Sequence, residues 1–400
     1  MVTRAGVGYS ENPQSEAAGL EAARAAMDRA GISRCDLALL FSTAKHDQAR
    51  LLRAVRSVVG SSTKIAGGGA AGVITNDRLG YEGCQVGIAV LASSSVEIHT
   101  FIQPGLTEDE YRVGHALGTQ IAKRSFRGKP NLFLMYESVK ASTPQGPRLN
   151  MATPLLEGME SALGSWPAVV GMGLHGDPRW IPALQYFDDG VETQSSLAVV
   201  LSGSARMQSM MTSNLKPMST YRQITNADGP AVLEIEGRPA LEVVEDLIGS
   251  DLRWEDYPLA ITLGVNGGDR FGEFKEEEYA NYLCVAIDRE RRALIMSDTF
   301  LRPGVEVQFM RRAMDFKEIR RRADRLVAET GGQSPFLALY VDCAGRSRMY
   351  TGSDAEEAEE IQAAVGKLPL LGLYSGSEIT KVGGRVRRLN NAGVLAIFTE

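Results

Sequence analysis

Apolar and polar positions follow one order three times along the chain. Each copy has an apolar run of strand length, a helix that ends at a glycine, a glycine-rich segment and a second apolar run. The opening runs are 37–42, 132–136 and 336–342, and the helices end at Gly60, Gly164 and Gly366. The glycine-rich segments begin six or seven residues later, at Gly67, Gly171 and Gly372. Because this spacing is kept over so few and such distant copies, it predicts related lobes of globular domains rather than a solenoid.

Helical and alternating patterns between the copies predict an α/β protein of two domains, 1–210 and 225–400. Each domain is expected to hold mixed β-sheets covered by helices, built on the recurring unit of strand, helix, glycine turn and strand. Apolar periodicity fades between 202 and 226, where we place the boundary. Four strand-like runs between 257 and 308 have no helix among them and predict an antiparallel meander. Asp47 is a predicted helix cap, and Thr107 with Glu110 forms a predicted capping box.

Composition narrows the class of protein. The 400 residues carry a net charge of −6, which argues against nucleic acid as a partner. The basic run Arg311-Arg312 is expected on the solvated face of a helix. Four cysteines lie far apart without a C-x-x-C pair, as in reduced intracellular proteins. No apolar run reaches the ~18 residues of a membrane span, and no signal peptide is apparent, so a cytoplasmic protein without membrane contact is expected.

Two glycine segments match the dinucleotide pattern G-x-G-x-x-G. They are Gly67, Gly69 and Gly72, and Gly171, Gly173 and Gly176. That fingerprint requires a helix to begin at the glycines, so that its N–H groups face a pyrophosphate. Neither continuation has helical periodicity, which excludes a nicotinamide cofactor. The glycines would instead let backbone approach backbone or ligand, or expose N–H groups to an anion.

Histidines are few and lack the spacing of metal ligands. His175 falls within the second glycine segment. We expect it to be a hydrogen-bonding loop residue, and no cofactor or metal is predicted. A haem-based nitric oxide sensor that uses His175 is the alternative.

The sequence feature that most clearly indicates a binding or catalytic site is the segment Cys343-Ala-Gly-Arg346-Ser-Arg348, which places a thiol close to two guanidinium groups. It follows a predicted strand, and ligands of α/β proteins commonly bind at strand ends. The planar fork of Arg346 suits a carboxylate, and Glu378 in the third glycine segment could receive an ammonium group. Spacing leaves two alternatives open: Cys343 can be a buried small side chain with Arg346 paired to Glu378, or Cys343 can be the nucleophile of a thiol enzyme.

Several motifs together resemble the FIST family, over essentially the whole chain. Gly8-Tyr9-Ser10 before an alanine-rich helix resembles the start of a FIST N domain, and Gly176-Asp177 resembles its second glycine turn. The C-x-G-R segment at Cys343, the segment Gly372-Leu-Tyr374 through Glu378-Ile379, and the late Asn390 resemble the FIST C signature. Ser377 stands where the family usually has glycine.

The resemblance implies a sensory protein of signal transduction that binds a small ligand, an amino acid or a similar carboxylate. A separately encoded kinase would be a possible signalling partner, and the protein would not be an enzyme. Arg346 would bind the ligand carboxylate and Glu378 a positive group, with Tyr9, Tyr374, Asp177 and Asn390 orienting the ligand. The full set of predicted ligand-binding residues is Tyr9, Ser10, Gly67, Gly171, Asp177, Cys343, Arg346, Tyr374, Glu378 and Asn390.

Overall fold

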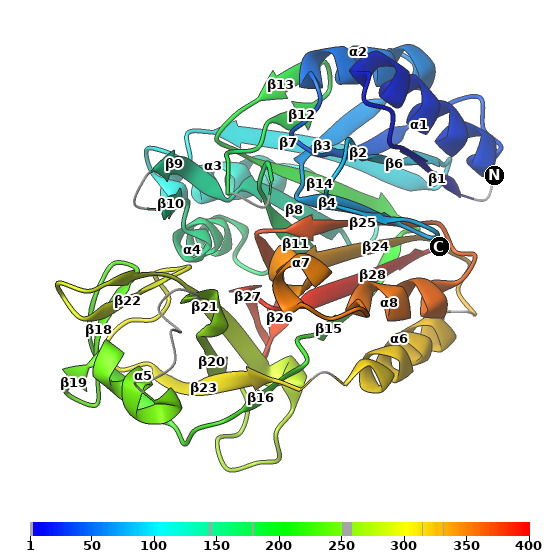
Figure 1. Cartoon of the computed structure of the whole chain (residues 1–400). Helices are drawn as coiled ribbons and strands as arrows, with labels where there is room; N and C mark the ends of the chain where they lie inside the picture. The colour runs from blue at the N-terminus through cyan, green and yellow to red at the C-terminus, as the bar shows by residue number, and fades with distance from the viewer. Residues whose placement is uncertain (1–2, 144–145, 178–179, 250–257, 314, 331) are drawn as a thin grey trace.

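The computed structural model describes residues 3–143, 146–177, 180–249, 258–313, 315–330 and 332–400. It confirms a mixed α/β fold. Three α/β lobes form one body, and a fourth, mostly antiparallel domain packs against it (Figure 1). No helix in the described ranges is long and apolar enough to cross a membrane.

Each lobe repeats the chain order strand, helix, strand, helix, strand and, after a β-hairpin, a last strand. Lobe 1 contains β1 (Arg4–Ser10), α1 (Ser15–Ala30), β2 (Leu37–Ser42), α2 (Gln48–Val59), β3 (Lys64–Gly69) and β6 (Val86–Ala92). Lobe 2 contains β7 (Val96–Pro104), α3 (Glu110–Ala122), β8 (Asn131–Glu137), α4 (Ala152–Leu163), β11 (Ala168–Leu174) and β14 (Ser195–Gly203). Lobe 3 contains β15 (Arg206–Thr212), α6 (Phe316–Thr330), β24 (Pro335–Cys343), α8 (Glu357–Val365), β25 (Leu370–Ser375) and β28 (Gly393–Thr399).

The three sheets share one strand order, and each is completed by a hairpin from another lobe. In lobe 1 the order is β1-β6-β2-β3, and only the β2–β3 pair is parallel. The hairpin of lobe 2, β12 (Gln185–Phe187) and β13 (Gly190–Glu192), extends the sheet of lobe 1. The hairpin of lobe 3, β26 (Ser377–Val382) and β27 (Arg385–Leu389), extends lobe 2, and that of lobe 1, β4 (Gly72–Thr75) and β5 (Leu79–Gly80), extends lobe 3. The exchange is therefore cyclic.

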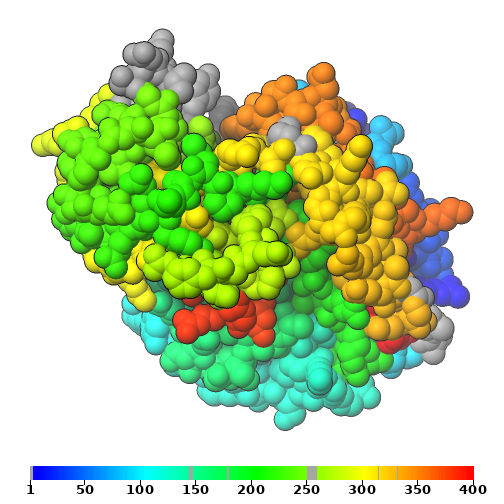
Figure 2. Space-filling view, turned by 90° about the horizontal axis from the view of Figure 1, so that it is seen from below, coloured from blue at the N-terminus to red at the C-terminus, as the bar shows by residue number. Residues whose placement is uncertain are grey.

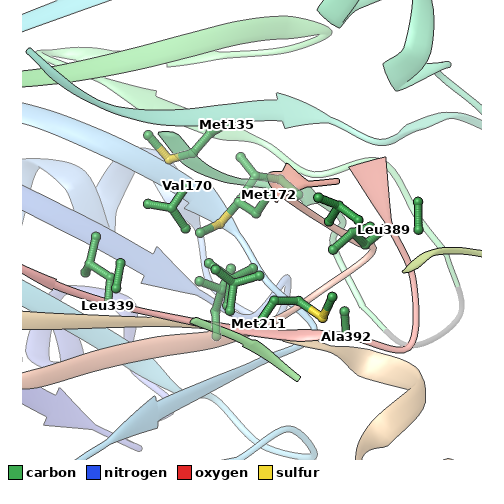
Figure 3. Close-up of a cluster of buried hydrophobic side chains, with 14 of the residues drawn as sticks. Met135, Val170, Met172, Met211, Leu339, Leu389 and Ala392 are labelled. Atoms are coloured by element: carbon green, nitrogen blue, oxygen red, sulfur yellow. The ribbon is translucent and has the colours of Figure 1, made fainter. Parts of the chain in front are cut away.

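The inner faces of the three sheets meet in one core. Along β2, Leu39 and Phe41 point into this core, while Ala38 and Leu40 point to the helices. Figure 3 shows the same core from the other lobes, with Met135, Val170 and Met172 of lobe 2 facing Leu339 and Met211 of lobe 3. Each outer face is covered by a helix pair: α1 with α2, α3 with α4, and α6 with α8. Strand alternation thus builds a central core and three outer ones.

The glycines of the repeat lie on strands rather than in the turns that follow them. Gly67, Gly171 and Gly372 occupy equivalent positions on β3, β11 and β25. A Cβ at these positions would lie 1.8, 2.5 and 2.6 Å from a carbonyl oxygen of the neighbouring parallel strand. The glycines therefore permit close approach of backbone to backbone.

Aspartate side chains cap the first turns of α2 and α3. The Asp47 side chain caps α2 by accepting a hydrogen bond from the Arg50 N–H, as expected. The predicted capping box at Thr107 is wrong, because α3 begins at Glu110 and is capped by Asp109.

The fourth domain, here called the meander domain, is inserted in lobe 3 between β15 and α6. Its strands and helix are β16 (Leu215–Pro217), β17 (Arg222–Asp228), β18 (Ala231–Ile235), β19 (Arg238–Pro239), α5 (Ala240–Ile248), β20 (Thr262–Asn266), β21 (Tyr279–Asp288), β22 (Ala293–Met296) and β23 (Glu306–Arg312). Its strand pairs are antiparallel, as predicted. The expected helix at Arg311-Arg312 is wrong, since both residues end β23. Figure 2 shows the domain in green to yellow, beside α6 and above the red hairpin of β26 and β27.

A short antiparallel ribbon of β9 (Val139–Thr143) and β10 (Gly146–Leu149) leaves lobe 2 beyond β8. Four-residue α7 (Arg348–Thr351) follows β24 in lobe 3.

Candidate functional site

A pocket of about 560 Å³ lies between the body and the meander domain. It opens where β11, β24 and β25 end, the side on which α/β sheets usually bind ligands. Lobe 2, lobe 3 and the meander domain all contribute to its wall. The lining residues are Pro147, His175, Trp180, Leu259, Ala260, Leu283, Val285, Arg312, Cys343, Ala344, Gly345, Tyr350, Ser375, Gly376 and Asn391.

Arg312 is the charged residue among the described residues of this wall. Its Nη2 donates hydrogen bonds to the Gly345 carbonyl oxygen, at 2.5 Å, and to Oδ1 of Asn391, at 3.3 Å. No carboxylate of the described residues lies within ion-pair distance of it. Burial lowers the pKa of Arg312, and the positive charge of Arg346 lowers it further. The carboxylates of Glu357 and Asp342 act on Arg312 from a longer distance and raise its pKa. A desolvated cation without a direct ion pair favours an anion in the pocket.

His175 and Trp180 form an aromatic part of the pocket wall. Their rings stack with centroids 5.6 Å apart and an interplanar angle of 19°. His175 is buried, and its Nδ1 has no hydrogen-bond partner among the described residues. Burial lowers the pKa of His175 to about 4, so the ring is neutral near pH 7. The wall offers a flat apolar surface and one free ring nitrogen.

Cys343 lines the pocket at the end of β24, as its place in the sequence predicted. Burial raises the pKa of its thiol to about 12, and the nearby Glu378 carboxyl raises it as well. A nucleophilic thiol needs a lowered pKa. The electrostatics of Cys343 are therefore those of a buried small side chain.

Asn391 belongs to the body, lines the pocket and contacts the meander domain. Its backbone has a φ of 50°, a left-handed conformation that asparagine tolerates better than most residues. Its Nδ2 donates to Oγ1 of Thr262 in the meander domain, at 3.0 Å. Because its Oδ1 accepts from Arg312, Asn391 holds the guanidinium in place from the body.

Arg346 lies behind the pocket wall rather than on it. Its side chain is buried and forms ion pairs with Asp342, at 3.0 Å, and with Glu357. Its Nη1 also donates to the Thr212 carbonyl oxygen, at 2.7 Å. These partners differ from the expected pairing with Glu378. The ligand role of Arg346 stays a prediction, but its described contacts are structural ones.

Glu378 is also buried, one layer below the pocket. Burial raises its pKa to about 8. Its Oε1 lies 2.8 Å from Oγ of Ser375, and that hydroxyl lies 3.1 Å from the Asp342 carbonyl oxygen. One hydroxyl proton cannot serve both oxygens. A protonated Glu378 resolves this, by donating to Ser375 while Ser375 donates to the carbonyl.

The remaining predicted site residues fall into two groups. Asp177 acts electrostatically on His175 and on Tyr350, which places it beside the pocket. Asn390 is buried next to Asn391 and donates from Nδ2 to the Gly376 carbonyl oxygen.

The others do not line the pocket. Tyr9 donates to Glu11, Ser10 to Glu21, and Tyr374 to Glu356. Gly67 and Gly171 are the close-approach glycines of the strands. The structure thus gathers Cys343 on the wall, with Asp177, Asn390 and Glu378 next to it.

Arg312, His175, Trp180 and Asn391 were not predicted as ligand-binding residues, although His175 was weighed as a haem ligand. Two signals pointed towards them in the sequence: Asn391 is adjacent to Asn390, and His175 falls within the second glycine segment. Arg312 belongs to the meander domain, and its place depends on how that domain packs.

Comparison with known proteins identifies the family. A FIST N domain matches residues 36–238, and a FIST C domain matches residues 240–381. The chain belongs to the FIST family. FIST domains are small-ligand sensory domains of signal transduction.

Among curated proteins, the FIST chain is similar to an uncharacterized protein of Mycobacterium tuberculosis, 26% identical over 236 residues. It is similar to another from Mycobacterium bovis, 25% identical over 239 residues. Each match covers 58% of this chain and 61% of the relative, so it spans less than two thirds of those proteins.

Among solved structures, a cyanuric acid hydrolase from A. caulinodans aligns with a TM-score of 0.27 and 11% identity, over 50% of this chain and 72% of its own. A second cyanuric acid hydrolase structure aligns with a TM-score of 0.28 and 10% identity, over 50% and 69%.

Proposed function

We propose that this FIST protein is a cytoplasmic sensor whose signal is the reversible binding of a small carboxylate in the pocket of Arg312. The carrying observation is the guanidinium of Arg312, which lines the pocket, is partly desolvated and has no carboxylate partner among the described residues. A ligand carboxylate would satisfy it. A charge-assisted hydrogen bond of this kind contributes ~1.5–3 kcal/mol.

The rest of the wall supports an apolar body for the ligand. The stacked rings of His175 and Trp180 favour a flat group, and Leu283 and Val285 line the meander side. Among the residues that the structure describes, the lining includes no aspartate or glutamate to receive an ammonium group. Glu378, once expected in that role, is buried beneath Ser375 and favours its protonated form. The proposal therefore favours a carboxylate without an ammonium group over a free amino acid.

Calorimetry with a matched series of probes tests the proposal. 3-Phenylpropionate carries the ring and the carboxylate, phenylalanine adds the ammonium group, and 3-phenylpropionamide removes the charge. We expect the first to bind most tightly and Arg312→Gln to weaken it by at least tenfold. Arg311→Gln, the exposed neighbour on the same strand, is the matched control and should bind as the unaltered protein does. Equal binding of acid and amide, or no loss in Arg312→Gln, would refute the role of Arg312.

The enzyme alternative has less support. Cys343 would have to ionise in a place where burial and Glu378 raise its pKa. Haem binding through His175 stays the alternative to the prediction of no cofactor. Because its ring stacks on Trp180 and is buried, iron ligation would require the wall to rearrange. A Soret band after incubation with haem, lost in His175→Ala, would favour that alternative.

A further inference from the structure

A second hollow, of about 720 Å³, lies at the far end of the strands that lead to the ligand pocket. We call it the basic groove. It is formed where β8 and β11 begin, at Asn131 and Ala168, and by the first residues of β15, Arg206–Gln208. Lobes 2 and 3 therefore both contribute to it.

The floor of the basic groove is apolar. Ile121 of α3, Leu163 of α4, and the rings of Phe126 and Trp166 supply it. Phe126, Leu163 and Trp166 are partly buried against the outer core of lobe 2, so each leaves some surface open. Aromatic and aliphatic surface of this kind receives the anchor side chains of a partner.

The charge around this floor has one sign. Arg124, Lys129 and Arg206 line the groove, and its described lining includes no acidic residue. Arg124 and Lys129 form no ion pair within the described ranges. Among the described residues, the Arg206 guanidinium donates only to backbone carbonyls, of which that of Ala205 is at 2.8 Å. On a chain of net charge −6, this local surface is complementary to an acidic partner.

One side of the groove is an open sheet edge. β15 ends the strand order of its sheet and pairs with β28 alone among the described strands. Figure 2 shows this green segment emerging between α6 and lobe 2. An extended segment can add to such an edge through backbone hydrogen bonds.

We propose that the basic groove is the docking site for an extended acidic segment of a partner protein, with one aromatic or large aliphatic side chain seated on Trp166. The apolar floor takes the anchor, and Arg124, Lys129 and Arg206 take the flanking carboxylates. An open edge strand beside them fits a peptide backbone better than a small free anion.

The groove is connected to the ligand pocket through a single strand. β11 starts at Ala168 in the groove and ends at Leu174, one residue before His175 in the pocket. Seven residues of strand span ~20 Å. A shift of β11 on ligand binding would move residues in both the pocket and the groove. A partner docked in the groove would then respond to the ligand. This link rests on the proposed function, while docking itself does not.

An array of 12-residue peptides tests docking. The peptides vary in two ways only: the number of glutamates and the presence of one central tryptophan or leucine. We expect binding to require both features and to weaken with added salt. For the best peptide, Arg124→Glu with Lys129→Glu should raise the Kd at least tenfold by fluorescence polarisation. The matched control is Arg24→Glu with Arg53→Glu, two exposed arginines of α1 and α2, which should leave the Kd unchanged.

Four outcomes would overturn the proposal. They are no binding by any peptide, equal binding by neutral peptides, equal loss in the control variant, or binding of citrate, a small free anion, where no peptide binds. Arg312→Gln should leave peptide binding intact without ligand, so a failure of the proposed pocket can be told apart from a failure of the groove.

Discussion

Asp298 of the meander domain caps α4 of lobe 2, the helix that begins at Ala152. Its Oδ2 accepts hydrogen bonds from the N–H groups of Ala152 and Thr153, each at 3.1 Å. The residue before the helix, Met151, has no side chain that can cap it. One carboxylate thus satisfies a helix end across the boundary between the domain and the body.

Asp298→Ala should therefore destabilise the protein by ~1–2 kcal/mol, the usual cost of a lost cap. Urea unfolding followed by circular dichroism measures this. Asp298→Asn keeps one acceptor oxygen and should lose less. An Asp298→Ala protein as stable as the unaltered one would show that the cap contributes nothing.

Arg346 gives a prediction that separates stability from binding. Arg346→Met removes a buried cation from between Asp342 and Glu357 and leaves two buried carboxyls unpaired. The expected loss is ~3–5 kcal/mol of unfolding free energy. Probe affinity, measured below the melting temperature, should change little. A stable Arg346→Met protein with no affinity for carboxylates would restore the role first predicted for Arg346.

Cys343 should react slowly with iodoacetamide. With its pKa raised from 9.0 to about 12, the thiolate fraction at pH 8 falls by roughly 10³ relative to an ordinary thiol. Alkylation should still be accelerating above pH 10, and 3-phenylpropionate should slow it further by covering the side chain. Mass spectrometry of the Cys343 peptide follows the reaction, with urea-unfolded protein as the fast reference. Rapid modification at pH 7 would revive the thiol enzyme.

Glu378 should make stability fall as pH rises. Burial raises the folded-state pKa of its carboxyl from 4.5 to about 8. The folded state then holds a proton that the unfolded state has lost, so this contribution to stability is complete below pH 4.5 and is lost as pH rises to about 8. Chemical denaturation between pH 5 and 8.5 measures the slope, which should flatten in Glu378→Gln. An unchanged slope would mean that another group titrates, Asp342 being the next candidate, since burial raises its pKa to about 7.

The recurring unit could be predicted from the sequence because each copy is specified by local features, namely apolar runs of strand length and glycines that end helices. Strand β2 has the predicted bounds, and Gly60, Gly164 and Gly366 end their helices as expected. The partner of each hairpin could not be predicted. Residues 185–187 alternate in the same way whether they join their own lobe or lobe 1, so the pattern cannot specify which sheet they complete.

The site was harder to predict than the fold for a related reason. An arginine in sequence does not show whether its counter-ion comes from the protein. Arg346 and Arg312 both lie near the ends of strands. Among the described residues, Arg346 forms ion pairs with the carboxylates of Asp342 and Glu357, whereas Arg312 forms none. Glu357 is eleven residues away on another element, and Arg312 reaches the wall only through the packing of an inserted domain.

Because the hairpins are exchanged cyclically, none of the three lobes has a complete sheet by itself. Excised at 3–92, lobe 1 would leave the edge of β3 bare and its own hairpin without a partner sheet, a combination that promotes aggregation. Damage to one hairpin opens a sheet in a different lobe. The body should therefore melt as one cooperative unit, and its many long-range pairings should make it a slow folder.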